Sequence, residues 1–306
     1  MGRCALPRPQ WPIAVFDDIM DLGVARRVNC SPRSWGTTVC WAPSYHFDAP
    51  GDLPPAEGSE KPKSLSLIIM ADDSVFFGLW EWSGPILPTA SNAAPATINF
   101  GLDVEHHHAV KGSLSSGLQF DSQGRKGVPH ACLSCHGGRY DAATGKVVGA
   151  SLLPLVPSRY ARTPLNSAGT GAPQESIRRI NQIILQSNPA PAIADQIDAL
   201  YGGAPTAPGT VANDSAVPAG WVQQVGLYRQ VIGPYCPSFH FAQRGSLSFR
   251  SWGNLLRHKV AVQSTVCREF TMPSSEILFR KFWTQGKAGS LPALLSTALG
   301  FQKCPE

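Results

Sequence analysis

The spacing of apolar residues changes near residue 125, and this change constrains the fold more than any other feature of the chain. Before it, short runs of β-branched and aromatic residues alternate with Pro, Gly, Asn and Asp, which is typical of strands and turns. The best strand candidates are residues 64–70, 74–82 and 96–104. Asp72-Asp73 separates the first two and predicts an antiparallel hairpin.

Beyond residue 160 apolar residues recur every three or four positions, which indicates amphipathic helices. Isoleucines mark the first two helices, and Gly202-Gly203 is expected to end the second. A third helix is predicted over residues 221–232, ended by Gly233-Pro234. A fourth is predicted after Met272-Pro273, with Ser274 as its N-cap. The first two helices are expected to bury Ile177, Ile180 and Ile184, and then Ile193, Ile197, Leu200 and Tyr201.

These patterns predict the α+β class, with a β-rich N-terminal domain at residues 1–125 and a mainly helical domain at residues 126–306. Hydrophobic residues make up 43% of the chain and charged residues 15%, which is enough to build a sizeable core. No apolar run approaches the ~18 residues that a membrane span needs. The net charge of +5 is scattered, so a nucleic-acid surface is not expected.

Cys132-Leu133-Ser134-Cys135-His136 has the C-x-x-C-H spacing of a c-type haem attachment site. Two thiols at this spacing can add to the vinyl groups on one edge of a porphyrin, while the adjacent imidazole ligates the iron. The motif therefore predicts haem c, bound through Cys132 and Cys135, with His136 on the iron. Gly137-Gly138 follows and would let the backbone pass close to a flat ligand.

Two other uses of this cysteine pair remain open. A pair of this spacing can hold structural zinc if two further ligands are present, and His106, His107, His108 and His130 lie upstream. A redox dithiol would be expected in a βαβ unit, and the surrounding pattern does not alternate in that way. The three adjacent histidines are either a solvated strand end or the source of a sixth iron ligand.

A second stretch has a similar order of elements. The third predicted helix leads into Cys236-Pro237-Ser238-Phe239-His240, and Met272-Pro273 precedes the last predicted helix. Class I cytochromes c have this order, and their methionine is an iron ligand, a role that suits a soft thioether. Phe239 occupies the place of the second thiol. The stretch is either a haem site with one thioether, His240 and Met272, or a relic whose helices persist as packing.

Residues 120–138, 221–243 and 267–283 resemble a group of uncharacterised bacterial secreted proteins related to c-type cytochromes. In that group Val-Pro precedes C-x-x-C-H-Gly-Gly, as at residues 128–138, and Pro-Ala-Gly-Trp precedes a helix and a second C-x-x-C-H, as at residues 218–240. Val-Cys and Met-Pro then close the pattern, as at residues 266–267 and 272–273. The resemblance implies a cytochrome c-like helical domain, and Phe239 departs from it.

The remaining cysteines predict an exported protein. Cys30 and Cys40 are ten residues apart, a spacing that suits a bridged hairpin, although two buried free thiols would also fit. Cys267 and Cys304 form a second candidate pair, and Cys4 has no obvious partner. Thioether attachment of haem and disulfides both favour a periplasmic or secreted location, although no signal peptide is visible in the first residues.

The sequence predicts an electron carrier with one haem c and a redox partner protein. One alternative is a haem-dependent, peroxidase-like oxidoreductase, which would need an acid–base residue such as His130 or one of His106–His108 beside an open iron position. The other alternative is a structural zinc module. Sequence signatures of hydrolases, of nucleotide-binding loops and of zinc peptidases do not occur in the chain.

Overall fold

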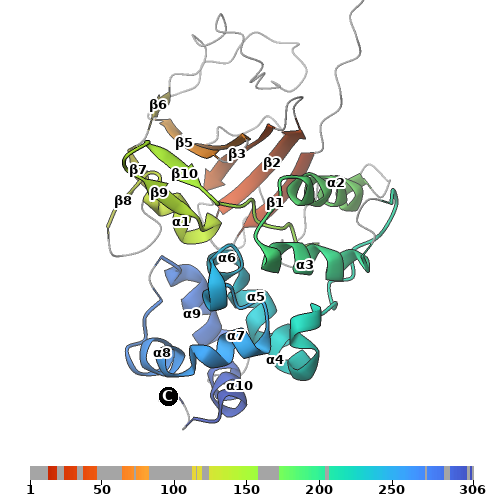
Figure 1. Ribbon diagram of the computed structural model, residues 1–306, viewed down its shortest axis with the longest axis vertical. Helices are drawn as coiled ribbons and strands as arrows, with labels where there is room; N and C mark the ends of the chain where they lie inside the picture. Colours follow the sequence, from red (N-terminus) through yellow and green to blue (C-terminus); the bar gives the residue numbers. More distant parts are fainter. Residues whose placement is uncertain are drawn as a thin grey trace, which may run out of the picture.

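In the computed structural model an antiparallel sheet covers one end of a helical body (Figure 1). This arrangement is mixed α+β, as the sequence predicts. The structure describes residues 13–18, 24–32, 37–46, 64–71, 74–82, 112–114, 116–118, 124–157, 172–203, 207–272, 274–285, 290–301 and 304.

The long strands form an antiparallel meander in which each strand pairs with the next along the chain. The predicted hairpin is confirmed: β4 and β5 pair from Ala71–Ser74 to Ser64–Glu81. The third strand candidate, residues 96–104, lies outside the described residues, as do the three adjacent histidines. The strands of the meander are β1 (Ile13–Asp18), β2 (Val24–Pro32), β3 (Thr38–His46), β4 (Ser64–Ala71) and β5 (Ser74–Trp82).

Strands from beyond residue 125 extend this sheet. A hairpin of β9 (Arg139–Asp141) and β10 (Lys146–Val148) adds to β5 through the pair Val147–Val75. The sheet therefore takes strands from both sides of the predicted domain boundary. Three short strands complete the set: β6 (Gly112–Leu114) pairs with β5, and β7 (Gly117–Leu118) pairs with β8 (Lys126–Gly127) in a separate small sheet.

The two faces of the sheet differ in exposure. Opposed residues point to the same face, so the pairs Ile68–Phe77 and Met70–Val75 line the inner face. Phe76 points the other way and is 52% exposed. The inner face also carries the first disulfide, Cys30–Cys40, which joins directly opposed residues of β2 and β3. Both of these cysteines are buried, and the predicted bridge is confirmed.

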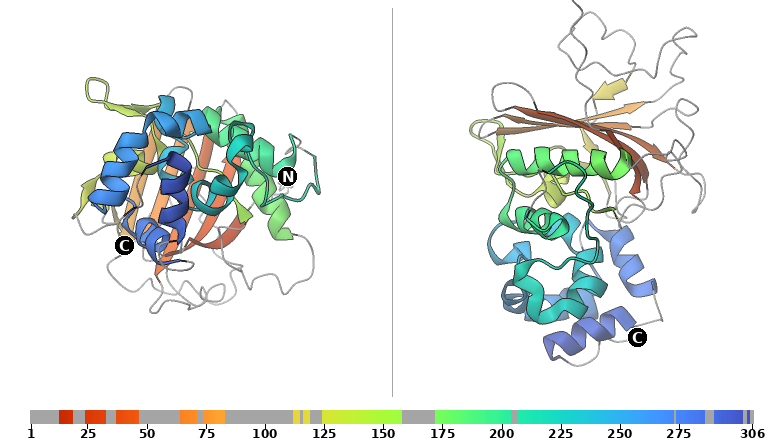
Figure 2. Two further views of the ribbon diagram at one scale, coloured as in Figure 1. Left: turned by 90° about the horizontal axis from the view of Figure 1, so that it is seen from below. Right: turned by 90° about the vertical axis from the view of Figure 1, so that its right-hand side faces the viewer.

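Helix α2 (Ala172–Gln186) packs against β1 and β2, and α3 (Pro191–Tyr201) follows it. The right-hand view of Figure 2 shows α2 directly below the sheet. The isoleucine spacing correctly predicts both helices, because all seven side chains that it assigned to their apolar faces are buried. Gly202 ends α3 in the left-handed conformation with φ 62°, which glycine adopts without strain.

The third predicted helix is longer than expected. Helical structure runs from Ala219 to Tyr235, so Gly233-Pro234 does not end it. The reason is a π-helical stretch over Tyr228–Ile232, where the N–H of Gly233 donates to the carbonyl of Tyr228. This wider turn leaves room for the proline ring, which would clash in a regular α-helix. The stretch consists of η4 (Ala219–Gln224), α4 (Val225–Leu227), η5 (Tyr228–Ile232) and α5 (Gly233–Tyr235).

The C-terminal elements are short and follow one another closely. The predicted N-cap is wrong by one residue: Ser275 precedes α9, whereas Ser274 has φ 66° and lies outside the helix. The elements are α6 (Pro237–His240), η6 (Gly245–Ser248), α7 (Trp252–Arg257), α8 (Lys259–Val262), η7 (Gln263–Arg268), α9 (Glu276–Thr284) and α10 (Ser290–Leu299).

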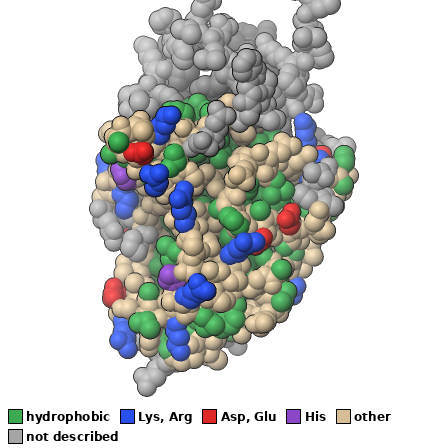
Figure 3. All heavy atoms as spheres, in the orientation of Figure 1, with side chains coloured by type: hydrophobic (Ala, Val, Ile, Leu, Met, Phe, Trp, Pro, Cys, Tyr) green, Lys and Arg blue, Asp and Glu red, His purple; other side chains and the backbone are tan. Residues whose placement is uncertain are grey.

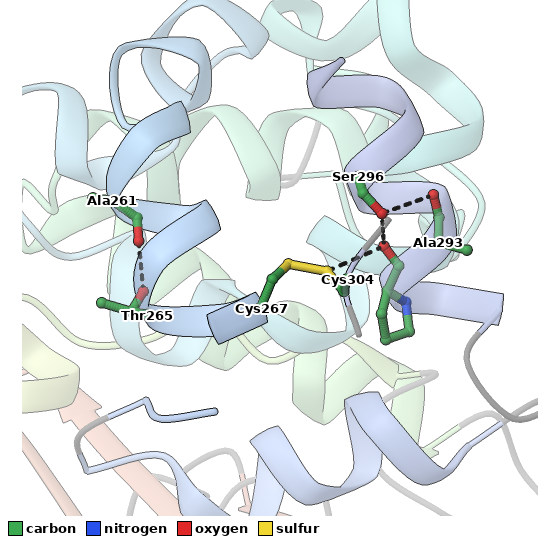
Figure 4. Close-up of a disulfide and its surroundings, with 7 residues drawn as sticks. Ala261, Thr265, Cys267, Ala293, Ser296 and Cys304 are labelled. Atoms are coloured by element: carbon green, nitrogen blue, oxygen red, sulfur yellow. Dashed lines mark hydrogen bonds between the residues drawn. A yellow bond between two sulfur atoms is a disulfide. The ribbon is translucent and has the colours of Figure 1, made fainter. Parts of the chain in front are cut away.

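A second disulfide, Cys267–Cys304, ties η7 to the segment after α10 (Figure 4). Both cysteines are buried in the main core, which extends from the Cys30–Cys40 bridge through α2 and α3 to the C-terminal helices. Near the centre of this core, Trp221 is fully buried, and its indole N–H donates to the carbonyl of Phe249 at 3.0 Å. Within the described ranges, none of the helices has the length and apolar character needed to cross a bilayer.

Candidate haem site

The C-x-x-C-H motif forms a short helix of its own, α1 (His130–His136), between β8 and β9. A helix turns about 100° per residue, so Cys132 and Cys135 lie on one side and His136 lies next to Cys132. Gly137 ends the helix with φ 64°, and its N–H donates to the carbonyl of Leu133. Both thiols and the imidazole are thus presented by less than two turns of helix, as the predicted chemistry requires.

His136 is held by the segment that follows β10. Its Nδ1 lies 2.7 Å from the carbonyl oxygen of Ser151, and the N–H of Ser151 donates to the carbonyl of His136 at 2.8 Å. A carbonyl only accepts hydrogen bonds, so Nδ1 carries the proton and Nε2 carries the lone pair. Histidines that ligate metals are oriented in this way by the hydrogen bond of their other nitrogen.

The thiol of Cys132 is partly removed from solvent. Burial raises the pKa of this thiol to about 11, against a weaker opposing effect of a backbone hydrogen bond. Reactive redox cysteines have lowered pKa values, so Cys132 differs from the attacking thiol of a dithiol oxidoreductase. A desolvated thiol suits a position that faces the apolar edge of a prosthetic group.

Gly137 and Gly138 allow the backbone at the end of α1 to lie close to other parts of the chain. A Cβ at Gly137 would clash with the carbonyl oxygen of Ala242, and one at Gly138 would lie 2.6 Å from the N atom of Ala150. These glycines therefore let the end of α1 pack against the chain's own backbone on two sides. In the folded chain, both glycines allow close packing between segments of the same chain.

The other two segments of the resemblance lie beside α1. Helix α6 packs against α1, and the side-chain amide of Gln243 donates to the carbonyl of Ser134 at 3.1 Å. The hydroxyl groups of Ser134 and Ser274 are 3.3 Å apart, which brings the start of the α9 region to the same helix. The structure thus brings all three segments together, although they are far apart in the sequence.

His240, at the end of α6, resembles His136 in one respect. Its Nδ1 lies 3.1 Å from the carbonyl oxygen of Leu247, and its ring stacks on Phe249 with centroids 4.0 Å apart. Burial, with a smaller effect of His258, lowers the pKa of His240 to about 4, so its imidazole is neutral at physiological pH. Phe239, in the place of the missing thiol, is buried, and Cys236 is half-buried.

Two further residues belong to the surroundings of the second stretch. Met272 is half-buried and packs against the main core. Trp283 of α9 packs against the same core, and its ring lies 5.0 Å from that of Phe270. Among the described residues, the buried indole N–H of Trp283 has no hydrogen-bond acceptor. Leaving such a donor without an acceptor costs about 1–3 kcal/mol, so an acceptor beyond the described residues would be favoured there.

Sequence reasoning missed the contacts that the sheet makes with α1. The ring of Phe77 in β5 lies 5.4 Å from the imidazole of His136. Leu133 packs against a cluster formed by Val75 and Val147 of the sheet and by Ala150, which follows β10. The alternation of Phe76 and Phe77 in a strand shows that only one of them faces inwards, but no local pattern shows that α1 lies there.

The zinc alternative has no ligand set in the part of the chain that the structure describes. Across the described ranges, no three His, Cys, Asp or Glu side chains are grouped as metal ligands. His130 is exposed at the start of α1, where its ring packs on Tyr140 at 5.6 Å.

Comparisons of the chain with protein-family models, with curated proteins and with solved structures found no match. The case for a functional site therefore rests on its residues. They are two thiols and an anchored imidazole on one helix, enclosed by the sheet, by α6 and by the start of the α9 region.

Proposed function

We propose that this protein is a c-type cytochrome that carries one haem and transfers electrons outside the cytoplasm. Cys132 and Cys135 attach the haem, and His136 ligates its iron. The observation that carries the proposal is the hydrogen bond from His136 Nδ1 to the carbonyl of Ser151, on the helix that bears both thiols. This bond fixes the tautomer and the orientation of the ring, as it does in histidines that ligate metals, and the spacing of the thiols suits a porphyrin edge.

The residues present fit such a group by their chemistry. When bound, haem supplies an iron that takes up and releases one electron. The chain contributes the rest: Ser151 orients the imidazole, burial desolvates Cys132, and Leu133 packs α1 against the sheet. Burial and the axial ligand are the means by which a protein sets the potential of such an iron.

Electron transfer needs no acid–base group, whereas a peroxidase-like reaction needs one beside an open iron position. Of the candidates for this role, His130 is exposed and engaged with Tyr140. His106, His107 and His108 lie outside the described residues.

An extracytoplasmic location is supported by the disulfides. Two bridges, Cys30–Cys40 and Cys267–Cys304, occur among the described residues, and such bridges persist in oxidising compartments. The thioether bonds proposed for α1 belong to the same compartment.

The charge distribution supports a partner with an acidic surface. Residues 1–123 carry 8 Lys and Arg against 13 Asp and Glu, whereas residues 124–306 carry 18 against 8. On the face drawn in Figure 3, Lys and Arg side chains outnumber acidic ones on the helical body. Complementary charge raises the rate of encounter between redox partners and loses this effect at high salt.

The roles of Cys236, His240 and Met272 stay predictions. We assign no attached haem to α6, because Phe239 is buried where a second thiol would be and because the ring of His240 is stacked on Phe249. His240 and Met272 remain the candidates for further iron ligation from the helical part.

The test counts haems and attachment points. The full chain is expressed with a periplasmic haem-maturation system and analysed by pyridine haemochrome spectroscopy and intact mass. One covalent haem is expected in the wild type and none in the Cys132→Ala/Cys135→Ala variant. Cys236→Ala is the matched control, because it removes a half-buried thiol outside the motif and should keep the haem. Zinc without haem in the purified wild type would contradict the proposal.

A further inference from the structure

The sheet contributes an aromatic side chain to the site, in addition to its packing against α1. The ring centroids of Phe77 and His136 are 5.4 Å apart, and the ring planes are tilted by 43°. We propose that Phe77 is a positioning residue that fixes the imidazole plane of His136 and shields it from water. This inference rests on the proposed function, because it assigns His136 to iron.

One hydrogen bond does not fix an imidazole completely. The hydrogen bond from Nδ1 to the carbonyl of Ser151 fixes the position of that nitrogen. The last side-chain torsion of a histidine has only a weak preference for particular angles. A ring held at one corner can still tilt about the line of that bond. A second contact at the ring, made here by Phe77, removes this freedom, and aromatic pairs favour tilted arrangements of this kind.

The same strand pairing places both groups that hold His136. The pair Val147–Val75 ties β10 to β5, and Ser151 follows β10 closely in the chain. Phe77 follows Val75 by two residues and therefore points to the same face. Ser151 and Phe77 thus have their positions set by one junction, which joins the N-terminal sheet to the segment after the haem motif.

The Phe77 ring is expected to affect the midpoint potential of the iron. Second-shell contacts and the exclusion of water tune a metal through its ligand, because a drier site disfavours the more highly charged oxidised iron. Loss of the Phe77 ring would admit water beside His136 and loosen the imidazole plane. The expected result is a lower midpoint potential and an altered paramagnetic resonance signal, with the covalent attachment unchanged.

Phe76 provides a matched control, because it is adjacent in the chain but lies on the opposite, exposed face. Phe77→Leu and Phe76→Leu are compared with the wild type as holoproteins, by haemochrome content, midpoint potential and electron paramagnetic resonance. Phe77→Leu is expected to lower the potential and shift the signal, whereas Phe76→Leu is expected to leave both unchanged. Phe77→Tyr keeps the aromatic ring and should therefore have the wild-type potential and signal. This variant tests the proposal even if Phe77→Leu folds poorly.

Each outcome decides one question. If all variants carry one haem and share the wild-type potential and signal, the role of Phe77 is overturned and the proposed function stands. The same holds if Phe76→Leu shifts the potential as much as Phe77→Leu, or if Phe77→Tyr fails to restore it. If the wild type carries no covalent haem, the proposed function itself is overturned.

Discussion

Helices α1 and α6 end alike but differ in what surrounds them. Each ends in a histidine whose Nδ1 lies close to a backbone carbonyl oxygen further along the chain, that of Ser151 or of Leu247. Only α1 has two cysteines three residues apart, whereas α6 has a buried phenylalanine at the corresponding position. The comparison teaches that anchoring an imidazole and pairing it with two cysteines are separable properties, and that α6 has the first without the second.

The largest expected effect concerns attachment. Digestion of the wild-type protein should give a haem peptide that contains Cys132 and Cys135, and none that contains Cys236, as mass spectrometry would show. Phe239→Cys makes the two motifs alike and removes a buried aromatic side chain, so under the proposed function the haem content should rise from one towards two per chain. A wild-type haem peptide that contains Cys236 would remove the distinction between the helices.

A smaller effect is expected for the backbone contact between the two helices. Gly137→Ala combines a left-handed residue with a clash against Ala242 and should cost about 2–5 kcal/mol of unfolding free energy. Gly245 also has a left-handed φ, of 61°, but a Cβ there meets open space. Gly245→Ala should therefore cost only about 1–2 kcal/mol. If urea unfolding gave the same loss of unfolding free energy for both variants, the backbone contact between α1 and the end of α6 would not be tight.

The third effect is a pH dependence that belongs to α6. Burial lowers the pKa of His240 to about 4, whereas an unfolded histidine has a pKa of about 6.5. The neutral form is favoured in the folded state, so this stability is complete above pH 6.5 and is lost as the pH falls towards 4. The full loss is roughly 3 kcal/mol.

Urea unfolding at pH 7 and at pH 4.5 measures this dependence. His240→Gln should flatten the difference between the two pH values, whereas the exposed His130 should change it little when replaced by Gln. An unchanged difference in His240→Gln would assign the dependence to other groups.

The smallest effect is local and concerns the thiol of Cys132 before haem is attached. Its pKa of about 11 lies two units above the ordinary value of 9.0. At pH 8 the thiolate fraction is therefore about 100-fold smaller than for an ordinary cysteine. Alkylation of Cys132 by iodoacetamide, followed by peptide mass, should be slow in the haem-free folded chain and fast in urea. Equal alkylation rates in the folded chain and in urea would show that the thiol is exposed to solvent in the folded chain.

The sequence predicts well those features that depend on neighbouring residues. The β4–β5 hairpin follows from two apolar runs and a polar turn, and α2 and α3 follow from isoleucine spacing. The Cys30–Cys40 bridge follows from a short separation, although its place on opposed residues of two strands depends on register. The C-x-x-C-H motif is recognised from five adjacent residues, although the helix that it forms was not predicted.

Features that depend on distant residues were not predictable from the sequence. The strands β9 and β10 are only three residues each, and their place in the sheet depends on pairing with β5. Ser151 and Phe77 meet His136 only after that pairing. The helix through Gly233-Pro234 was missed because the π-helical turn that accommodates proline has no sequence signature of its own.

The hairpin of β9 and β10 also has a consequence for the order of events during folding. Helix α1 reaches its position only when this hairpin pairs with β5, a contact between distant parts of the chain. Such pairing is slow, because the chain loses loop-closure entropy before the new contact stabilises it. Burial in the folded chain raises the pKa of Cys132. Under the proposed function, covalent attachment through this thiol would therefore be fastest before folding is complete.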